Sequence, residues 1–296
     1  MLLSYAAASL ITSSLLGMEA DAGAFGWSGA QYDKASEGQF QAGLMLCNNH
    51  LKPDGPMNVL ELGSGTGRFA KWLALTLPEG STVLGIDNNR SMIDEALRKQ
   101  QVEPIENLTF QLKDARELHH DLNFFEKFEL ALSIFCLHWI PSEQEMIDTM
   151  KGIAHSLKPG GQFIAIANIQ DHEEHAVELH KAARIIMNSD KWRQYYEGKM
   201  VLGNDIPLSK YQEIIAGAGL KGKAFIFNPP ARNISTEERN ASLLAIPFGQ
   251  VIPQERREEF LQEMSVVFES LGLKNEDDTY QQTIPCIVIV AEKDNS

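Results

Sequence analysis

VLELGSGTGRFA, residues 59–70, is an apolar run with one acidic residue that breaks into three alternating glycines. Glycines at the end of a predicted strand permit a tight turn and let a ligand approach the backbone closely. A dinucleotide fingerprint, G-x-G-x-x-G, needs its third glycine at position 68, where this chain has Arg68. The stretch therefore predicts a strand, a turn and a helix that bind a ligand other than a dinucleotide.

An acidic residue closes the next predicted strand. Asp87 follows the apolar run STVLGI and stands 20 residues after Gly67. A carboxylate in that position can accept two hydrogen bonds from the hydroxyl groups of a ribose. The glycine loop and Asp87 together predict a ligand that carries a ribose but no pyrophosphate.

Strand-like and helix-like segments alternate over residues 58–170. Short apolar runs typical of buried strands are followed by amphipathic runs with helical spacing. Ser142 and Glu145 stand in capping-box spacing, which predicts a helix opened by Ser142, and KPGG at 158–161 predicts a turn into the next strand. The alternation predicts an α/β fold with a doubly wound parallel sheet, whose ligand crevice lies at the carboxyl ends of the strands.

Composition narrows the class of partner. The chain has 296 residues, and its 26 Lys and Arg against 40 Asp and Glu give a formal net charge of −14. Proteins that bind nucleic acid place basic residues in patches that this sequence lacks, so a small-molecule substrate is expected and a nucleic acid is not.

HEEH at 172–175 spaces its histidines three apart instead of the four that a zinc-binding helix needs, so no metal is expected.

The first 17 residues carry no charge. Three interpretations fit them: an N-terminal extension, a misassigned start with Met18 as the true one, and an export signal with an A-x-A-like ADA at 20–22. The missing Lys or Arg disfavours export, and the Ser, Thr and Ala content disfavours a stable membrane span. Three widely spaced cysteines form no disulfide framework, as in a reducing compartment. A cytoplasmic location is therefore expected, with secretion as the alternative.

Five motifs in order resemble those of the class I S-adenosylmethionine (SAM) methyltransferases: VLELGSGTGRFA, VLGIDNNRSM, LKDAREL, LALSIFCLHW and LKPGG. The resemblance implies SAM as the cofactor and a Rossmann-like, seven-stranded, mostly parallel sheet with a helical cap and an antiparallel C-terminal strand. It implies a methyltransferase domain over residues 18–296, with cap inserts at about 171–217 and 231–275. From the methionine end of SAM past the ribose to the adenine, the implied contacts are Tyr32, Glu61, Gly63, Ser64, Gly65, Gly67, Asp87, Asn88, Met92, Asp114, Ala115 and Phe135.

Within that family, four stretches resemble the trans-aconitate and juvenile hormone acid methyltransferases: WSGAQYDKASEGQ, CLHW, DKWRQYY and IPFGQVIPQERREEFLQE. These enzymes methylate small carboxylic acids. The resemblance implies that the Gln39 amide and the indole N–H of Trp139 hold the carboxylate of the substrate. The cap inserts stand where a lid that selects the substrate is expected.

The acceptor atom stays open at this point. An ionised carboxylate needs no general base at neutral pH, so alignment and exclusion of water can suffice for methyl transfer. An acceptor hydroxyl, nitrogen, carbon or carrier-protein thioester has a proton to lose, and His138 is then the candidate base. A third interpretation is a SAM-binding regulator or secreted effector that has lost turnover.

Overall fold

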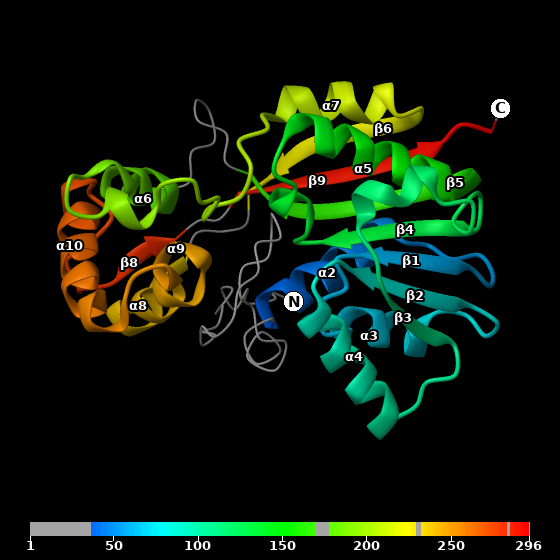
Figure 1. Ribbon diagram of the computed structural model, residues 1–296, viewed down its shortest axis with the longest axis horizontal. Helices are drawn as coiled ribbons and strands as arrows, with labels where there is room; N and C mark the ends of the chain where they lie inside the picture. The colour runs from blue at the N-terminus through cyan, green and yellow to red at the C-terminus, as the bar shows by residue number, and fades with distance from the viewer. Residues whose placement is uncertain (1–36, 170–177, 229–231, 283–284, 296) are drawn as a thin grey trace.

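The computed structural model describes residues 37–169, 178–228, 232–282 and 285–295 (Figure 1). Tyr32, the first 17 residues and the HEEH stretch lie outside these ranges. The seven-stranded sheet has the order β3-β2-β1-β4-β5-β9-β6. Its strands are β1 (Asn58–Leu62), β2 (Thr82–Asp87), β3 (Leu108–Leu112), β4 (Phe128–Ile134), β5 (Leu157–Asn168), β6 (Leu220–Phe227) and β9 (Cys286–Lys293).

The central strands β1 and β4 of the parallel part are mostly buried, whereas the edge strand β3 has exposed positions. β1 pairs in parallel with β2 and β4, and β5 continues the sheet beside β4. β9 is inserted antiparallel between β5 and β6. This confirms the predicted doubly wound sheet with its antiparallel C-terminal strand.

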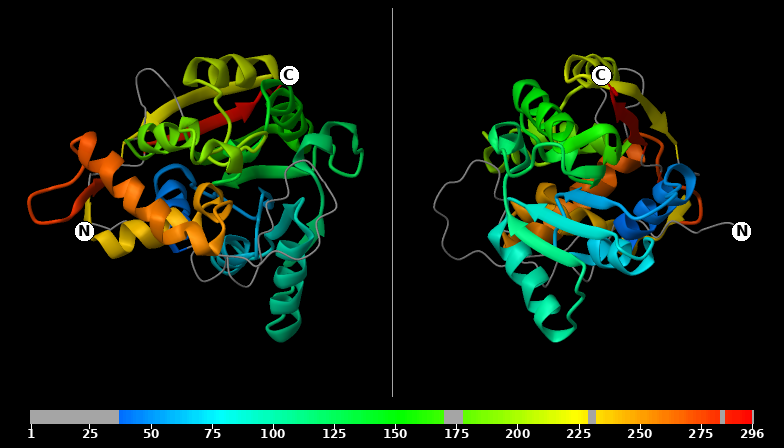
Figure 2. Two further views of the ribbon diagram at one scale, coloured as in Figure 1. Left: turned by 60° about the vertical axis from the view of Figure 1, so that its left-hand side comes forward. Right: turned by 90° about the vertical axis from the view of Figure 1, so that its right-hand side faces the viewer.

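Helices cover both faces of the sheet (Figure 2), and an apolar cluster lies on each face. On one face, α2 (Glu37–His50) and α3 (Arg68–Thr76) pack over the strands. On the other face, α5 (Glu143–Ser156) and α7 (Leu208–Gly217) pack over them together with the 3₁₀ helix η1 (Ala115–His120). A further helix, α4 (Arg90–Val102), connects β2 to β3.

The KPGG stretch does not form the predicted turn but lies inside β5. Leu157 pairs with Phe128, whereas Gln162 pairs with Leu130, so the register shifts across the four residues between Leu157 and Gln162. Gly160 has φ 75°, a left-handed conformation that glycine adopts without strain. The irregularity is therefore absorbed within the strand as a bulge.

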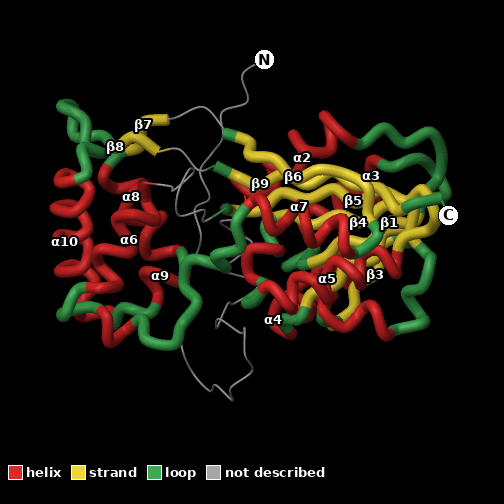
Figure 3. The backbone as a smooth tube through the Cα atoms, turned by 90° about the horizontal axis from the view of Figure 1, so that it is seen from above, coloured by secondary structure: helices red, strands yellow, loops and turns green. Residues whose placement is uncertain are grey.

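A third apolar cluster forms the core of a helical cap near the carboxyl ends of the parallel strands (Figures 1 and 3). Trp192, Phe248 and Phe260 are fully buried in it. The elements of the cap are α6 (Glu178–Asn188), the 3₁₀ helix η3 (Arg193–Tyr195), α8 (Thr236–Ala245), α9 (Pro247–Gln250), α10 (Arg257–Ser270) and a two-stranded antiparallel sheet of β7 (Arg232–Ile234) and β8 (Tyr280–Gln282). α7, although it falls within the predicted insert 171–217, packs on the sheet through Tyr211 and Ile215.

Candidate functional site

The glycine loop after β1 lies against the loop after β4. Gly63 has φ 67°, and a Cβ atom built there would lie 2.4 Å from the Cβ of Cys136. Gly67 caps the N-terminus of α3 with φ 79°, and a Cβ atom there would lie 2.3 Å from the ring of Phe110. Any larger residue would push these loops apart, so the glycines set how closely the backbone approaches a ligand.

Asp87 ends β2 and fixes the glycine loop through backbone amides. Its Oδ2 accepts a hydrogen bond from the N–H of Gly65 at 2.9 Å, and its Oδ1 accepts one from the N–H of Asn89 at 2.8 Å. Burial raises the pKa of Asp87, an effect that these two amide hydrogen bonds oppose and the charge of Asp114 adds to. The carboxylate is thus oriented before any ligand arrives.

One cavity at the carboxyl ends of the strands brings together most of the predicted residues. β1, β2, β3 and β4 all end at this edge of the sheet. The predicted residues that line it are Gln39, Gly63, Gly65, Asp87, Asn88, Met92, Asp114, Ala115, Phe135 and Trp139. Phe135 has φ 53°, an unusual backbone conformation for an aromatic residue and one often found at functional sites.

A smaller hollow continues from this cavity towards α3. It shares Gln39 and Gly63 with the larger one and also reaches Glu61 and Ser64. Glu61 Oε2 and Ser64 Oγ are buried and have no hydrogen-bond partner among the described residues. Burial, and then the charge of Asp87, raises the pKa of Glu61 well above its ordinary value. Unsatisfied buried oxygens of this kind fit a ligand that brings N–H donors.

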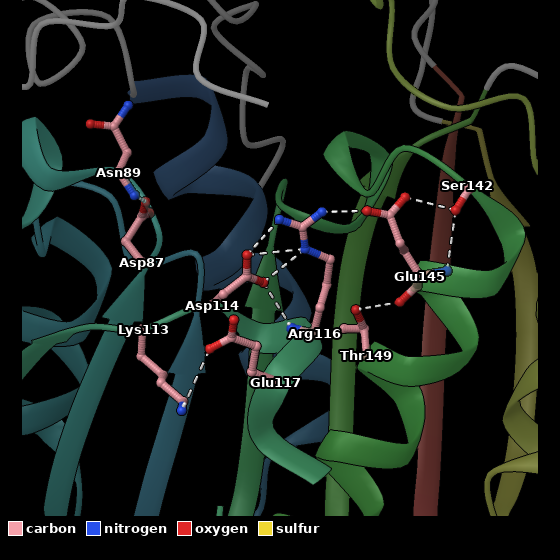
Figure 4. A network of polar contacts seen from close by, with 9 residues as sticks. All are labelled: Asp87, Asn89, Lys113, Asp114, Arg116, Glu117, Ser142, Glu145 and Thr149. Carbon is pink, nitrogen blue, oxygen red and sulfur yellow. Dashed lines mark hydrogen bonds and ion pairs between the residues drawn. The ribbon is translucent and has the colours of Figure 1, made fainter. Parts of the chain in front are cut away.

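Arg116 is a site residue that sequence reasoning missed (Figure 4). It lines the cavity, and its Nη2 lies 2.6 Å from Asp114 Oδ2. Its Nη1 also pairs with Glu145 in the first turn of α5. Burial works to raise the pKa of Asp114, but the hydrogen bonds from Arg116 outweigh it and hold that pKa below its ordinary value. Arg116 therefore keeps Asp114 ionised and connects it to the first turn of α5.

Trp139 and His138 are neighbours with different surroundings. Both lie in the 3₁₀ turn η2 (Leu137–Trp139), but of the two only Trp139 lines the cavity. His138 is 3% exposed, and burial, followed by the nearby His180, lowers its pKa to about 3. The structure thus places Trp139 in the cavity wall and leaves His138 outside it.

No three His, Cys, Asp or Glu side chains in the described part of the chain are grouped so that they could hold a metal ion. None of the helices in the described ranges combines the length and the apolar character that a membrane crossing needs.

Comparisons with known proteins agree with this geometry. Residues 59–161 match the family described as "Methyltransferase domain". The "Putative methyltransferase 235L" of Invertebrate iridescent virus 6 is 25% identical over 243 residues, which cover 80% of this chain and 83% of that protein.

Solved structures share the fold. The YcgJ protein of a Bacillus species has a TM-score of 0.58 at 15% identity, covering 87% of this chain and 99% of that one. Phosphoethanolamine N-methyltransferase 2 of Haemonchus contortus, in complex with S-adenosyl-L-methionine, has a TM-score of 0.54 at 20% identity. That alignment covers 87% of this chain and 53% of that chain.

Proposed function

We propose that this chain, a class I SAM-dependent methyltransferase, transfers a methyl group to the carboxylate of a small acid. The observation that carries the choice of acceptor is the chemistry of the cavity wall. Among the described residues that line the cavity there is no histidine, tyrosine or glutamate. A carboxylate acceptor fits such a wall because it is already ionised at neutral pH.

The ionisable side chains that do line the cavity are poor general bases. Asp87 is held by two backbone amides and Asp114 by Arg116. Lys113 forms an ion pair with Asp121, with its Nζ 3.0 Å from Asp121 Oδ2. Burial raises the pKa of the Cys136 thiol to about 12. Each group is thus engaged elsewhere or in the wrong protonation state to remove a proton from a substrate near pH 7.

The residues at the site fit SAM. Bound there, SAM supplies a methyl group on a positively charged sulfonium. The Asp87 carboxylate is oriented to accept hydrogen bonds from the ribose hydroxyls. The unsatisfied oxygens of Glu61 and Ser64 would accept hydrogen bonds from the methionine ammonium group.

Protein residues then act by orientation and by excluding water. Gln39 and Trp139 would donate hydrogen bonds to the acceptor carboxylate at one side of the cavity. Ile140 and Pro141 add an apolar wall beside them. In-line displacement needs the attacking oxygen held close to the methyl carbon, and positioning of this kind supplies a large part of the rate enhancement.

The direct test is methyl transfer from radiolabelled SAM to a panel of small mono-, di- and tricarboxylic acids, with matched alcohols, amines and carrier-bound thioesters as competitors. We expect label in a methyl ester that mild alkali releases as methanol. Label that resists alkali in an ether or amine product would contradict the proposal and identify the other acceptor class.

A substitution at His138 separates the two acceptor classes. We expect His138→Asn to keep kcat within about threefold of the parent enzyme, since a neutral histidine outside the cavity has no proton to accept from a carboxylate. The measurement is initial rate at saturating SAM, with thermal unfolding as the control for fold. A loss of about 100-fold or more in a folded variant would point to general-base catalysis.

Binding of SAM should release a proton from Glu61. Burial raises the pKa of Glu61 in the free protein, whereas a neighbouring ammonium favours the ionised form. Affinity should therefore rise with pH up to that raised pKa and level off above it. Calorimetric titrations in phosphate and Tris buffers, which differ in ionisation enthalpy, measure the protons released.

The control for that titration is Glu61→Gln, in which the proton release should disappear. Equal enthalpies for the parent protein in the two buffers would show that no proton is exchanged and that Glu61 does not meet the ammonium group.

A further inference from the structure

The turn that carries Trp139 is held by one residue from the chain segment that returns from the cap to the sheet. Asn204 lies in that segment, before α7. Its Nδ2 donates hydrogen bonds to the carbonyl oxygens of Leu137 and Ile140, each at 3.0 Å. Its backbone N–H donates to the carbonyl oxygen of His138 at 2.7 Å. Three carbonyl groups on both sides of Trp139 thus bind the same residue.

The Asn204 side chain is buried and its polar atoms are engaged. It is 6% exposed. Its Oδ1 accepts hydrogen bonds from the Ile206 N–H at 3.3 Å and from the Tyr211 hydroxyl at 3.5 Å. Tyr211 belongs to the core under the sheet, and burial raises its pKa to about 12. We call the hydrogen bonds from Asn204 to the η2 carbonyl groups the clamp. Through the Asn204 amide, whose Nδ2 donates and whose Oδ1 accepts, the clamp connects the η2 turn to the packed core.

The backbone of η2 is also held by hydrogen bonds of the turn itself, from the Trp139 N–H to the Cys136 carbonyl oxygen at 2.9 Å and from the Ile140 N–H to the Leu137 carbonyl oxygen at 3.1 Å. It is a single 3₁₀ turn whose preceding residue, Cys136, makes no side-chain capping hydrogen bond. Trp139, Ile140 and Pro141 follow in the cavity wall. Removing the amide donors would take this partner from the Ile140 carbonyl oxygen and leave the Leu137 carbonyl oxygen with the Ile140 N–H, so the turn would shift to satisfy the lost hydrogen bonds.

We propose that Asn204 is a positioning residue that holds the η2 turn so that the Trp139 indole faces the acceptor. The acceptor half of this inference rests on the proposed carboxylate function, whereas the orientation of Trp139 by Asn204 does not. The residue acts through Trp139 and does not itself line the cavity. It makes the segment leaving the cap part of the substrate-binding machinery.

The test uses Asn204→Asp, which keeps the size of the side chain and the acceptor for Ile206 but loses both Nδ2 donors. Tyr211→Phe is the matched control, because it removes a buried polar contact to Asn204 and leaves the clamp on η2 intact. The readout is acrylamide quenching of Trp139 emission, obtained by subtracting the signal of the same variant with Trp139→Phe. Calorimetric titration of SAM is measured in parallel.

We expect quenching of Trp139 to increase in Asn204→Asp and to stay at the parent value in Tyr211→Phe. SAM affinity should be unchanged in both, since neither residue lines the cavity or touches Asp87. With a carboxylic acid that the panel identifies, kcat/KM should fall about 10- to 100-fold in Asn204→Asp, through misplacement of the acceptor.

A folded Asn204→Asp protein with parental Trp139 quenching would overturn the inference. If this variant does not fold, Asn204→Ala, which introduces no charge, is measured in the same way and judged by the same criterion. If no acid in the panel is methylated, the proposed function fails, while the quenching experiment still decides the role of Asn204.

Discussion

We expect Asp87→Ala to lose most of its affinity for SAM, on the order of a hundredfold or more, because hydrogen bonds to a charged acceptor contribute about 1.5–3 kcal/mol each. The carboxylate would accept two hydrogen bonds from the ribose. It also holds the amides of Gly65 and Asn89, which shape the glycine loop. Isothermal titration of SAM into the parent and the variant measures the loss.

The control for Asp87→Ala is Glu129→Ala, which removes a carboxylate of similar structural role from the opposite ends of the strands. Glu129 accepts a hydrogen bond from the N–H of Asn58 at 2.6 Å and pairs with Lys158. We expect Glu129→Ala to lower the midpoint of thermal unfolding and to leave SAM affinity unchanged. If Asp87→Ala bound SAM with the affinity of the parent protein, Asp87 would not bind the ribose, and the assignment of this cavity to the cofactor would be wrong.

Local sequence patterns predicted most of the sheet because each pattern depends on interactions between residues that are close together in the chain. Ser142 caps α5 as predicted, with its side chain accepting a hydrogen bond from the Glu145 N–H. β1 and β2 coincide with the apolar runs that precede the glycines and Asp87, and they pair in parallel. The glycine loop and the acid at the end of β2 also lie where the motif spacing requires.

Contacts between residues far apart in the chain escaped prediction. Arg116 stands within the LKDAREL motif, but nothing near it in the sequence indicates that it pairs with Glu145 of α5. The η2 carbonyls that bind Asn204 belong to the backbone, so they leave no trace in side-chain patterns. His138 and Trp139 are adjacent in sequence, and the sequence does not show that the His138 imidazole is buried while the Trp139 indole lines the cavity. That difference is visible only in the folded structure.

The acceptor side of the site can be isolated by Trp139→Phe. This change keeps an aromatic ring in the cavity wall and removes the indole N–H. We expect KM for the carboxylic acid to rise about tenfold or more, since a hydrogen bond to a charged group contributes about 1.5–3 kcal/mol. SAM affinity should stay at the parent value, because the loop and carboxyl groups expected to bind SAM are unchanged. Initial rates over a range of acid concentrations, with calorimetry for SAM, measure both.

The matched control is Trp72→Phe, at a half-buried tryptophan of α3 that packs on Phe69 with ring centroids 5.2 Å apart. It makes the same chemical change away from the cavity and should leave KM for the acid unaltered. A similar rise of KM in both variants would mean that loss of stability, and not loss of the indole donor, explains the Trp139→Phe result. A rise confined to Trp139→Phe, and larger when Gln39→Leu is added, would assign the substrate carboxylate to these two donors.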